Sequence, residues 1–109
     1  RYIKIGTLVQ CTARLNLTTL GTITGTTSIS GLPFTSATLT NEIAGGCLIY
    51  HNTWTTSIIY LVGLVSSNTA SAILRIKTAA SANLETGVVQ ADLANTSELV
   101  LYIVYRASA

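Results

Sequence analysis

Charged side chains are scarce in this sequence of 109 residues. They account for 9% of it, whereas a soluble domain typically carries about 25%. Chains stay disordered when they combine low hydrophobicity with high charge, so a composition with 49% hydrophobic residues excludes that class. Long apolar runs are missing as well: the longest, 58–65, contains Gly63 and is far shorter than the roughly 18 residues of a membrane-spanning helix. We therefore expect a compact domain, without membrane insertion, that has more apolar surface than one small core can hide.

The few charges also limit the possible partners. Six Lys and Arg residues and four acidic residues leave a formal net charge of +2. The basic residues are scattered singly along the chain, whereas a nucleic-acid site needs a basic stripe that displaces counterions from phosphates. We therefore expect no nucleic-acid partner.

Methionine is absent, and the chain begins at Arg1. Its length suits one ordinary domain with one hydrophobic core. We expect 1–109 to be a single domain and the C-terminal part of a longer chain.

Cysteine is limited to Cys11 and Cys47. Both lie in alternating apolar stretches, where cysteine acts as a small buried hydrophobic residue. We expect two free thiols; one disulfide is the alternative, although a secreted scaffold of this size usually carries more bridges. Two cysteines and the single His51, spread along the chain, do not make a metal site.

Threonine is the residue that the chain has in excess, with 18 copies beside 10 serines. Thr, Val, Ile and Tyr favour strands, and no stretch keeps the apolar spacing of a helix. The chain is therefore predicted to be all-β, a single-domain antiparallel β-sandwich of the jelly-roll type. The expected strands are 2–5, 8–18, 26–31, 42–51, 57–65, 72–79, 87–91 and 98–106. The weakest element is 84–96, where 91–95 has a helical turn as its alternative.

Two of these strands are apolar on both faces, 58–65 and 99–105. An antiparallel strand of this kind needs cover on both sides. A partner subunit is the simplest cover, because burying one Leu or Ile contributes roughly 1.5–3 kcal/mol. The alternative is that a loop or a preceding part of the chain covers that face. The residues expected at a subunit interface are Ile59, Leu61, Val65, Val100, Tyr102 and Val104.

Three stretches of the chain carry a resemblance to a known family. They are the opening Tyr2-x-Lys4-Ile5-Gly6, the segment 25–36 with its run Ile-Ser-Gly-Leu-Pro-Phe-Thr-Ser, and the closing strand that ends at Ala107. The sequence resembles the C-terminal β-sandwich domains of bacteriophage tail fibres, tailspikes and related virion appendage proteins. The resemblance spans nearly the whole chain, and 29–36 is its most specific part; the stretch from Thr38 to Trp54 departs from it. It implies a homotrimer at the tip of an appendage that serves trimer assembly, receptor contact or both.

Pro33 and Phe34 have a structural interpretation of their own. Proline has no N–H for a sheet ladder and favours an extended predecessor, so a strand is expected to end here. Phe34 is the only phenylalanine. We expect it to plug one end of the sandwich.

Catalytic signatures are absent. The four acids, Glu42, Glu85, Asp92 and Glu98, lie in no motif, although Glu85 and Asp92 have the alternative of facing each other across a turn. His51 is the sole candidate base and has no neighbouring acid to orient it. We therefore expect no enzyme and no cofactor.

The stretch 50–54 is the candidate binding segment. It contains Tyr50, His51, Asn52 and Trp54, which pool the only Trp and the only His at an expected strand end. An aromatic ring offers a flat apolar face to a sugar, and Asn and His add directional hydrogen bonds. A glycan contact by these four residues is the hypothesis; its alternative is a Trp that belongs to the core or to an interface.

The resemblance and the two-faced strands together predict a non-catalytic, trimeric virion appendage domain. Such a domain is assembled in the cytoplasm of the bacterial host and is located in the virion. Its expected partners are two further copies of itself, other virion structural proteins and a host surface glycan. The alternatives are a capsid-decorating or head-fibre protein, a carbohydrate-binding module and, more remotely, an esterase or lyase.

Overall fold

The computed structural model describes residues 1–40, 42–78 and 85–108. It confirms the all-β prediction, because the described part of the chain holds antiparallel strands and no α-helix. The strands are β1 (Tyr2–Ile5), β2 (Leu8–Asn16), β3 (Ser28–Ser30), β4 (Gly45–Asn52), β5 (Tyr60–Val65), β6 (Ser71–Lys77), β7 (Thr86–Gly87) and β8 (Glu98–Arg106).

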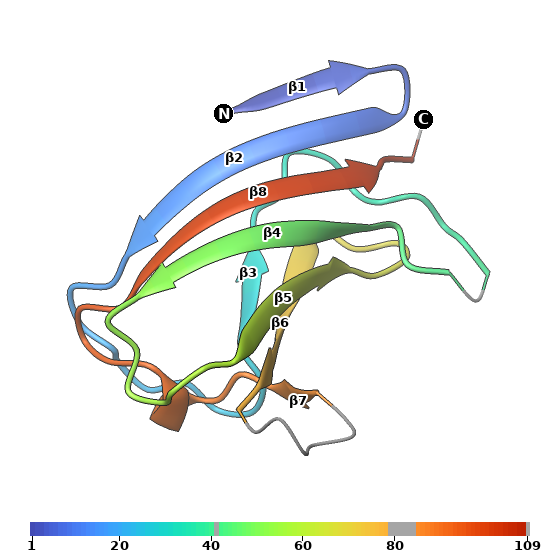
Figure 1. The fold of residues 1–109 in the computed structure, drawn as a ribbon. Coiled ribbons are helices and arrows are strands. Elements are labelled where there is room, and N and C mark those ends of the chain that lie inside the picture. Colours follow the sequence, from blue (N-terminus) through green and yellow to red (C-terminus); the bar gives the residue numbers. More distant parts are fainter. Residues whose placement is uncertain (41, 79–84, 109) are drawn as a thin grey trace.

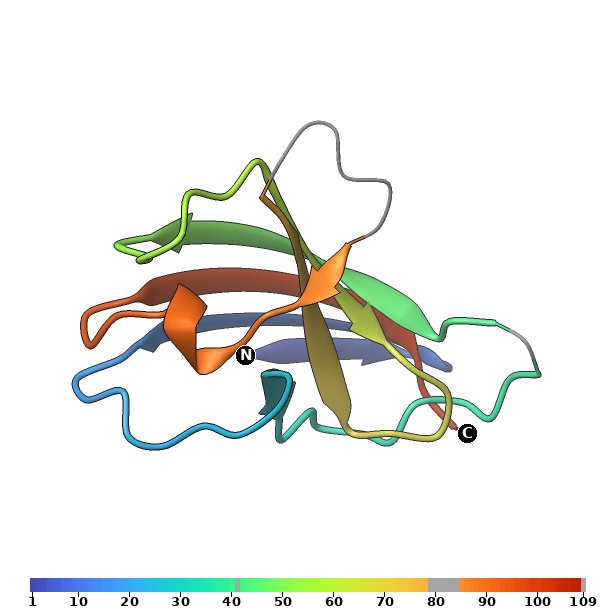
Figure 2. The ribbon, with the colours of Figure 1, turned by 90° about the horizontal axis from the view of Figure 1, so that it is seen from below.

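These strands form one sheet in the order β1-β2-β8-β4-β5-β6-β3, with β7 beside β6. The sheet curls into a half-barrel (Figure 1). Figure 2 shows β6 crossing beneath the layer formed by β1, β2, β8 and β4. Because β1 and β3 are the two ends of the strand order, the described strands leave an open seam on the side where the curl does not close.

The strand boundaries follow the predictions where the apolar alternation is regular. β1 and β8 have the predicted limits, and β2 ends two residues early, at Asn16. The segment 84–96 differs: from Glu85, where its description begins, it contributes the short β7 and a 3₁₀ turn, Gln90–Asp92, in place of a strand over 87–91. Asp92 sets this turn, because its side chain accepts a hydrogen bond from the Val89 N–H at 2.9 Å.

The concave face of the sheet holds the core. Along β8 every second residue is buried there: Leu99, Leu101, Ile103 and Tyr105. One core cluster joins β2, β4 and β8; a second, built around Leu74 and Ile76 of β6, lies next to it and also contains Leu93 and Leu99. The alternation of β8 therefore fixes which side of the sheet faces the interior.

The segment 29–36 is held against the core through Phe34, which is half-buried. Gly31 turns the chain with a φ of +88°, a conformation that glycine adopts readily. The buried Tyr105 hydroxyl then donates to the Phe34 carbonyl at 2.9 Å and accepts from the Phe34 N–H at 3.2 Å. The Phe34 ring packs against the first core cluster and meets the Tyr2 ring edge-on, with the ring centres 5.3 Å apart. These contacts hold the connection between β3 and β4 against Tyr105 of β8.

Candidate functional site

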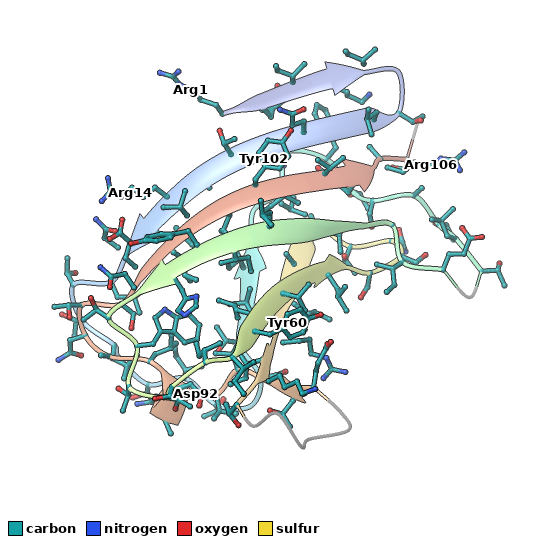
Figure 3. All side chains as sticks on the ribbon, in the orientation of Figure 1. Arg1, Arg14, Tyr60, Asp92, Tyr102 and Arg106 are labelled. Atoms are coloured by element: carbon teal, nitrogen blue, oxygen red, sulfur yellow. The ribbon has the colours of Figure 1, made fainter. Side chains whose placement is uncertain are left out.

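The convex face of the sheet is apolar and exposed. Tyr102 in β8 pairs with Thr12 on one side and Leu48 on the other. Leu48 keeps 77% of its surface exposed and Tyr102 keeps 41%. Figure 3 labels Tyr102 on β8. Leucine at this exposure in the middle of a strand is costly in water, and contiguous apolar patches of this kind mark interaction sites.

The neighbouring rows extend this patch across the sheet. In the next row of the register, Val100 lies between Arg14 and Tyr50, whose exposed fraction is 59%. In the row on the other side, Val104 pairs with Gly46, and Gly46 with Leu64 of β5. We call this surface the convex patch, and its members are Leu48, Tyr50, Leu64, Val100, Tyr102 and Val104.

The predicted interface residues divide between the two faces. Val100, Tyr102 and Val104 lie on the convex face of β8. The prediction is wrong for Val65, which is fully buried in the core, and for Leu61, which packs on the second cluster from the concave side. The opposite face of the same strand, with Val62 and Leu64, is the one that faces outward. Periodicity alone could not tell the faces of 58–65 apart, since both are apolar.

Ile59, the remaining member of the predicted interface, lies just before β5 and is exposed. Its N–H donates to the Lys77 carbonyl at 2.9 Å, so its backbone is held beside the end of β6. Ile59 is not a member of the convex patch.

The four predicted glycan contacts do not converge on one site. Successive residues of β4 point to opposite faces, so Tyr50 and Asn52 lie on the convex side and His51 on the concave side. Trp54 packs on the second core cluster, meets the His51 ring edge-on and donates from Nε1 to the Glu98 carbonyl at 3.4 Å. The structure therefore supports the alternative for Trp54, a place at the edge of the core.

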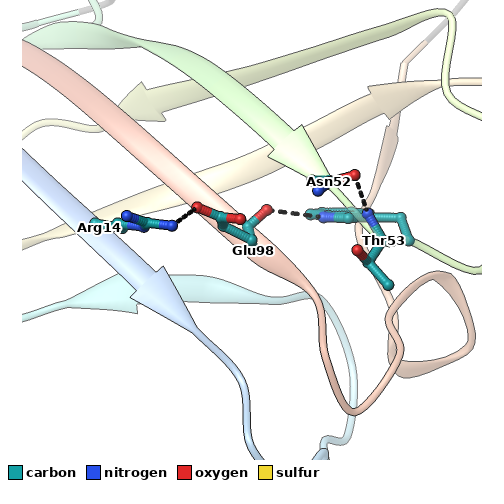
Figure 4. A network of polar contacts seen from close by, with 5 residues as sticks. Arg14, Asn52, Thr53 and Glu98 are labelled. Atoms are coloured by element: carbon teal, nitrogen blue, oxygen red, sulfur yellow. Dashed lines mark hydrogen bonds and ion pairs between the residues drawn. The ribbon is translucent and has the colours of Figure 1, made fainter.

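A polar row borders the convex patch at one end. Asn16, Glu98 and Asn52 are cross-strand neighbours, and the Arg14 guanidinium forms an ion pair with the Glu98 carboxylate at 2.6 Å. Figure 4 shows this pair and the Asn52 side chain, which accepts a hydrogen bond from the Thr53 N–H. Because the two charges neutralise each other, this edge presents no net charge to an approaching surface.

Three connecting segments meet at this same end of the sheet: 17–27, 53–59 and 88–97 (Figure 1). Side-chain hydrogen bonds link them, and we call them the loop end. Gln90 accepts from the Ile23 N–H and donates to the Gly21 carbonyl. Thr56 donates to the Asp92 carboxylate at 2.7 Å, and Ser97 donates to the Thr53 carbonyl at 2.9 Å. The loops are thus held by the scaffold and by one another, which is the arrangement in which binding residues are commonly placed.

Exposed hydroxyl and amide groups cover the loop end. They belong to Thr18, Thr19, Thr22, Thr24, Asn95 and Thr96. The sequence alone does not single these residues out, because polar loops are also what solvent demands. The high density of threonine in 17–27 is the sequence feature that could have indicated a surface rich in hydroxyl groups.

Glu85 and Asp92, which had the alternative of facing each other across a turn, have separate partners. Asp92 is occupied by Val89 and Thr56, and Glu85 accepts from the Tyr60 hydroxyl at 2.9 Å, so these two acids do not pair. That hydrogen bond to the Glu85 carboxylate raises the pKa of Tyr60, because the phenol proton is held by an anion. No group of three His, Cys, Asp or Glu side chains within 1–40, 42–78 and 85–108 is placed to hold a metal ion.

Both cysteines are free and buried, as expected. Cys11 and Cys47 lie on opposite sides of Ile103 in the same row of the sheet. Burial raises the pKa of the Cys47 thiol to about 11, and the neighbouring Cys11 adds to the effect. A thiol in this state is protonated at neutral pH and therefore a poor nucleophile.

Comparison of the chain with family models, with curated proteins and with solved structures finds no match. Among the described residues we find no helix with the length and apolar character that a membrane crossing requires.

Proposed function

We propose that this chain is a non-catalytic domain of a homotrimeric virion appendage, a tail fibre or tailspike, that holds three copies together and carries a host-attachment surface. The observation that supports this proposal is the convex patch, in which the side chains of Leu48, Tyr50 and Tyr102 lie exposed on neighbouring strands. The resemblance of 25–36 to phage appendage domains supplies the number of copies and the biological setting.

The chemistry of the convex patch favours a second copy of the chain as its cover. Its centre carries no charge, and Arg14 at its border is paired with Glu98. Arg75 and Arg106 lie further out on the same face. Fully burying a Leu or a Tyr removes apolar surface worth roughly 1.5–3 kcal/mol per side chain. A handful of such residues per subunit is enough to offset much of the entropy lost on association.

The same proposal includes a jelly-roll-like β-sandwich. In this interpretation β2, β8 and β4 form one layer of the curled sheet, and β6 with β3 forms the opposing one. The core clusters that lie between these strands are consistent with two layers.

The loop end is the attachment surface in this proposal. It displays hydroxyl and amide groups on hydrogen-bonded loops, which suit the many hydroxyls of a host surface glycan. Three weak sites on one rigid trimer bind a repetitive surface with an avidity far above the affinity of each site.

Assembly is tested by the absolute mass in solution, measured by light scattering behind a sizing column. We expect three times the 11.5 kDa of the chain, and a monomer for Leu48→Glu, because a carboxylate cannot be buried unpaired in an apolar interface. Ile43→Glu is the matched control, since Ile43 is also exposed but lies in the segment before β4; it should stay trimeric. A wild-type protein that is a stable monomer contradicts the proposal.

Attachment is tested separately, on the trimer. Purified bacterial lipopolysaccharides and capsular polysaccharides are immobilised, and binding of the wild type is compared with that of Thr22→Arg and Thr96→Arg at the loop end. We expect both variants to lose at least about tenfold in avidity at unchanged mass, because the bulky side chains block the surface. Thr7→Arg, in the turn at the other end of β2, is the control. Equal loss in all three variants, or binding to none of the polysaccharides, argues against this attachment surface.

A further inference from the structure

Gly46 interrupts one row of the convex patch, because it has no side chain to contribute there. It faces outward between Val104 of β8 and Leu64 of β5, and Leu48 is the next residue of β4 on the same face. Glycine inside a strand weakens the strand, because it loses the most conformational freedom on folding and has nothing to pack. A glycine at this position therefore needs a reason.

The seven other glycines of the chain have reasons within its own structure. Four of them have a positive φ, which glycine adopts readily; these are Gly6, Gly21, Gly25 and Gly31. At the remaining three, a Cβ would lie within 2.6 Å of an atom of another residue, which is too close for a real side chain; these are Gly45, Gly63 and Gly87. The chain itself thus disfavours a larger residue at each of these seven positions.

Gly46 has neither of these reasons. Its φ is not positive, and the nearest atom to a Cβ at this position would be the Gly63 carbonyl oxygen at 3.4 Å, an ordinary contact. A side chain at position 46 would project outward into the space between Val104 and Leu64, and we call this space the Gly46 gap. Because the described part of the chain does not require the gap, we look for its cause in what covers the sheet.

Leu48 has the opposite character, because its side chain projects from the sheet. Its exposed fraction of 77% is the highest among the large apolar side chains of the described residues. The reason is local: the ladder between β4 and β5 ends at Cys47, so Leu48 has a strand neighbour, Tyr102, on one side only. Alternate residues of a strand are about 7 Å apart. A projecting side chain and a gap therefore lie next to each other on β4.

We propose that Leu48 of each copy enters the Gly46 gap of the next copy in the assembly. This inference rests on the proposed homotrimer and names the contact that holds its subunits together. The occupant is a second copy, because the convex patch carries both the projecting side chain and the gap that accepts it. The contact joins two different parts of the patch, and such head-to-tail contacts generate a ring when the rotation closes. Gly46 is then the place where another chain approaches β4, which is a common reason for glycine within a strand.

The first experiment fills the gap. Gly46→Val adds a side chain that favours strands, and the mass in solution is measured by light scattering over a dilution series. We expect the concentration at which half of the trimer dissociates to rise at least about tenfold, because the valine overlaps with Leu48 of the next copy. Ser28→Val is the matched control, since Ser28 is an exposed residue of β3 outside the convex patch. This variant should dissociate as the wild type does.

The second experiment measures folding apart from assembly, by urea unfolding of Leu48→Glu with and without Gly46→Val. Leu48→Glu is expected to be a monomer, so assembly does not contribute to this comparison. We expect Gly46→Val to leave the unfolding midpoint unchanged or to raise it, since the described residues leave room for the side chain. A lower midpoint would show that the chain itself needs this glycine, and it would overturn the proposal.

The third experiment tests Leu48 as the side chain that enters the gap. A shorter side chain overlaps less with a filled gap, so Leu48→Ala should impair assembly less in the Gly46→Val background than in the wild type. If the wild type is a trimer, additive effects of the two changes overturn this proposal alone, and so does a Gly46→Val variant that assembles like Ser28→Val. A monomeric wild type overturns the proposed trimer as well, so the two failures are distinguishable.

Discussion

At the scale of single residues, the fold depends on a few side chains whose partners lie far away in the sequence. Tyr105 is the clearest case, because its hydroxyl serves both the N–H and the C=O of Phe34, 71 residues away. Burial raises the pKa of Tyr105, while the hydrogen bond to Phe34 acts in the opposite direction. This one phenol anchors the segment 29–36 to β8.

We expect Tyr105→Phe to lower the free energy of unfolding by about 1–3 kcal/mol, since two hydrogen bonds disappear and Phe34 keeps backbone groups without a partner. Urea denaturation monitored by circular dichroism measures the change. Tyr102→Phe removes a hydroxyl from the exposed convex face of the same strand and should change stability by less than about 0.5 kcal/mol. Equal effects in the two variants would show that the link to Phe34 does not stabilise the fold.

At the scale of elements, the pairing of β4 with β5 includes two glycines, Gly46 and Gly63, whose surroundings differ. Gly63 lies opposite Cys47, and a Cβ at position 63 would lie 2.6 Å from the Cys47 Sγ and 2.8 Å from its Cβ. Gly46, next in β4, points to the convex side, where a Cβ would lie 3.4 Å from the Gly63 carbonyl oxygen. Gly63 faces the core and allows β4 and β5 to approach each other there. Gly46 faces the convex side and not the core.

Gly63→Ala should therefore destabilise the protein by about 1–3 kcal/mol through overpacking. Gly46→Ala should be close to neutral, because Ala also suits a strand better than Gly. Thermal unfolding of both variants by calorimetry makes the comparison. If Gly46→Ala proves the more harmful of the two, the close packing at Cys47 is not what requires a glycine here.

At the scale of the whole molecule, two surfaces have separate places. The convex patch lies on the outer side of the sheet, and the loop end at one end of the strands. Because the convex patch and the loop end share no residues, Leu48→Glu should act on assembly and Thr22→Arg on attachment, each independently of the other.

The sequence by itself determined the all-β class and the limits of β1 and β8. The alternation of β2 and β8 is regular, and threonine and β-branched residues leave no helical alternative over those stretches. It also indicated that β8 has two apolar faces. These features depend on neighbours in the chain, so local patterns suffice to predict them.

Only the tertiary structure decided which faces turn outward. In 58–65 both faces are apolar, so the burial of Leu61 and Val65 followed from pairing with β4 and β6 and not from periodicity. The prediction of one glycan contact did not hold together either, because neighbouring residues in a strand point to opposite sides. Its four residues were Tyr50, His51, Asn52 and Trp54. The seam and the loop end depend on contacts between residues far apart in the chain, and such contacts exist only once the sheet has curled.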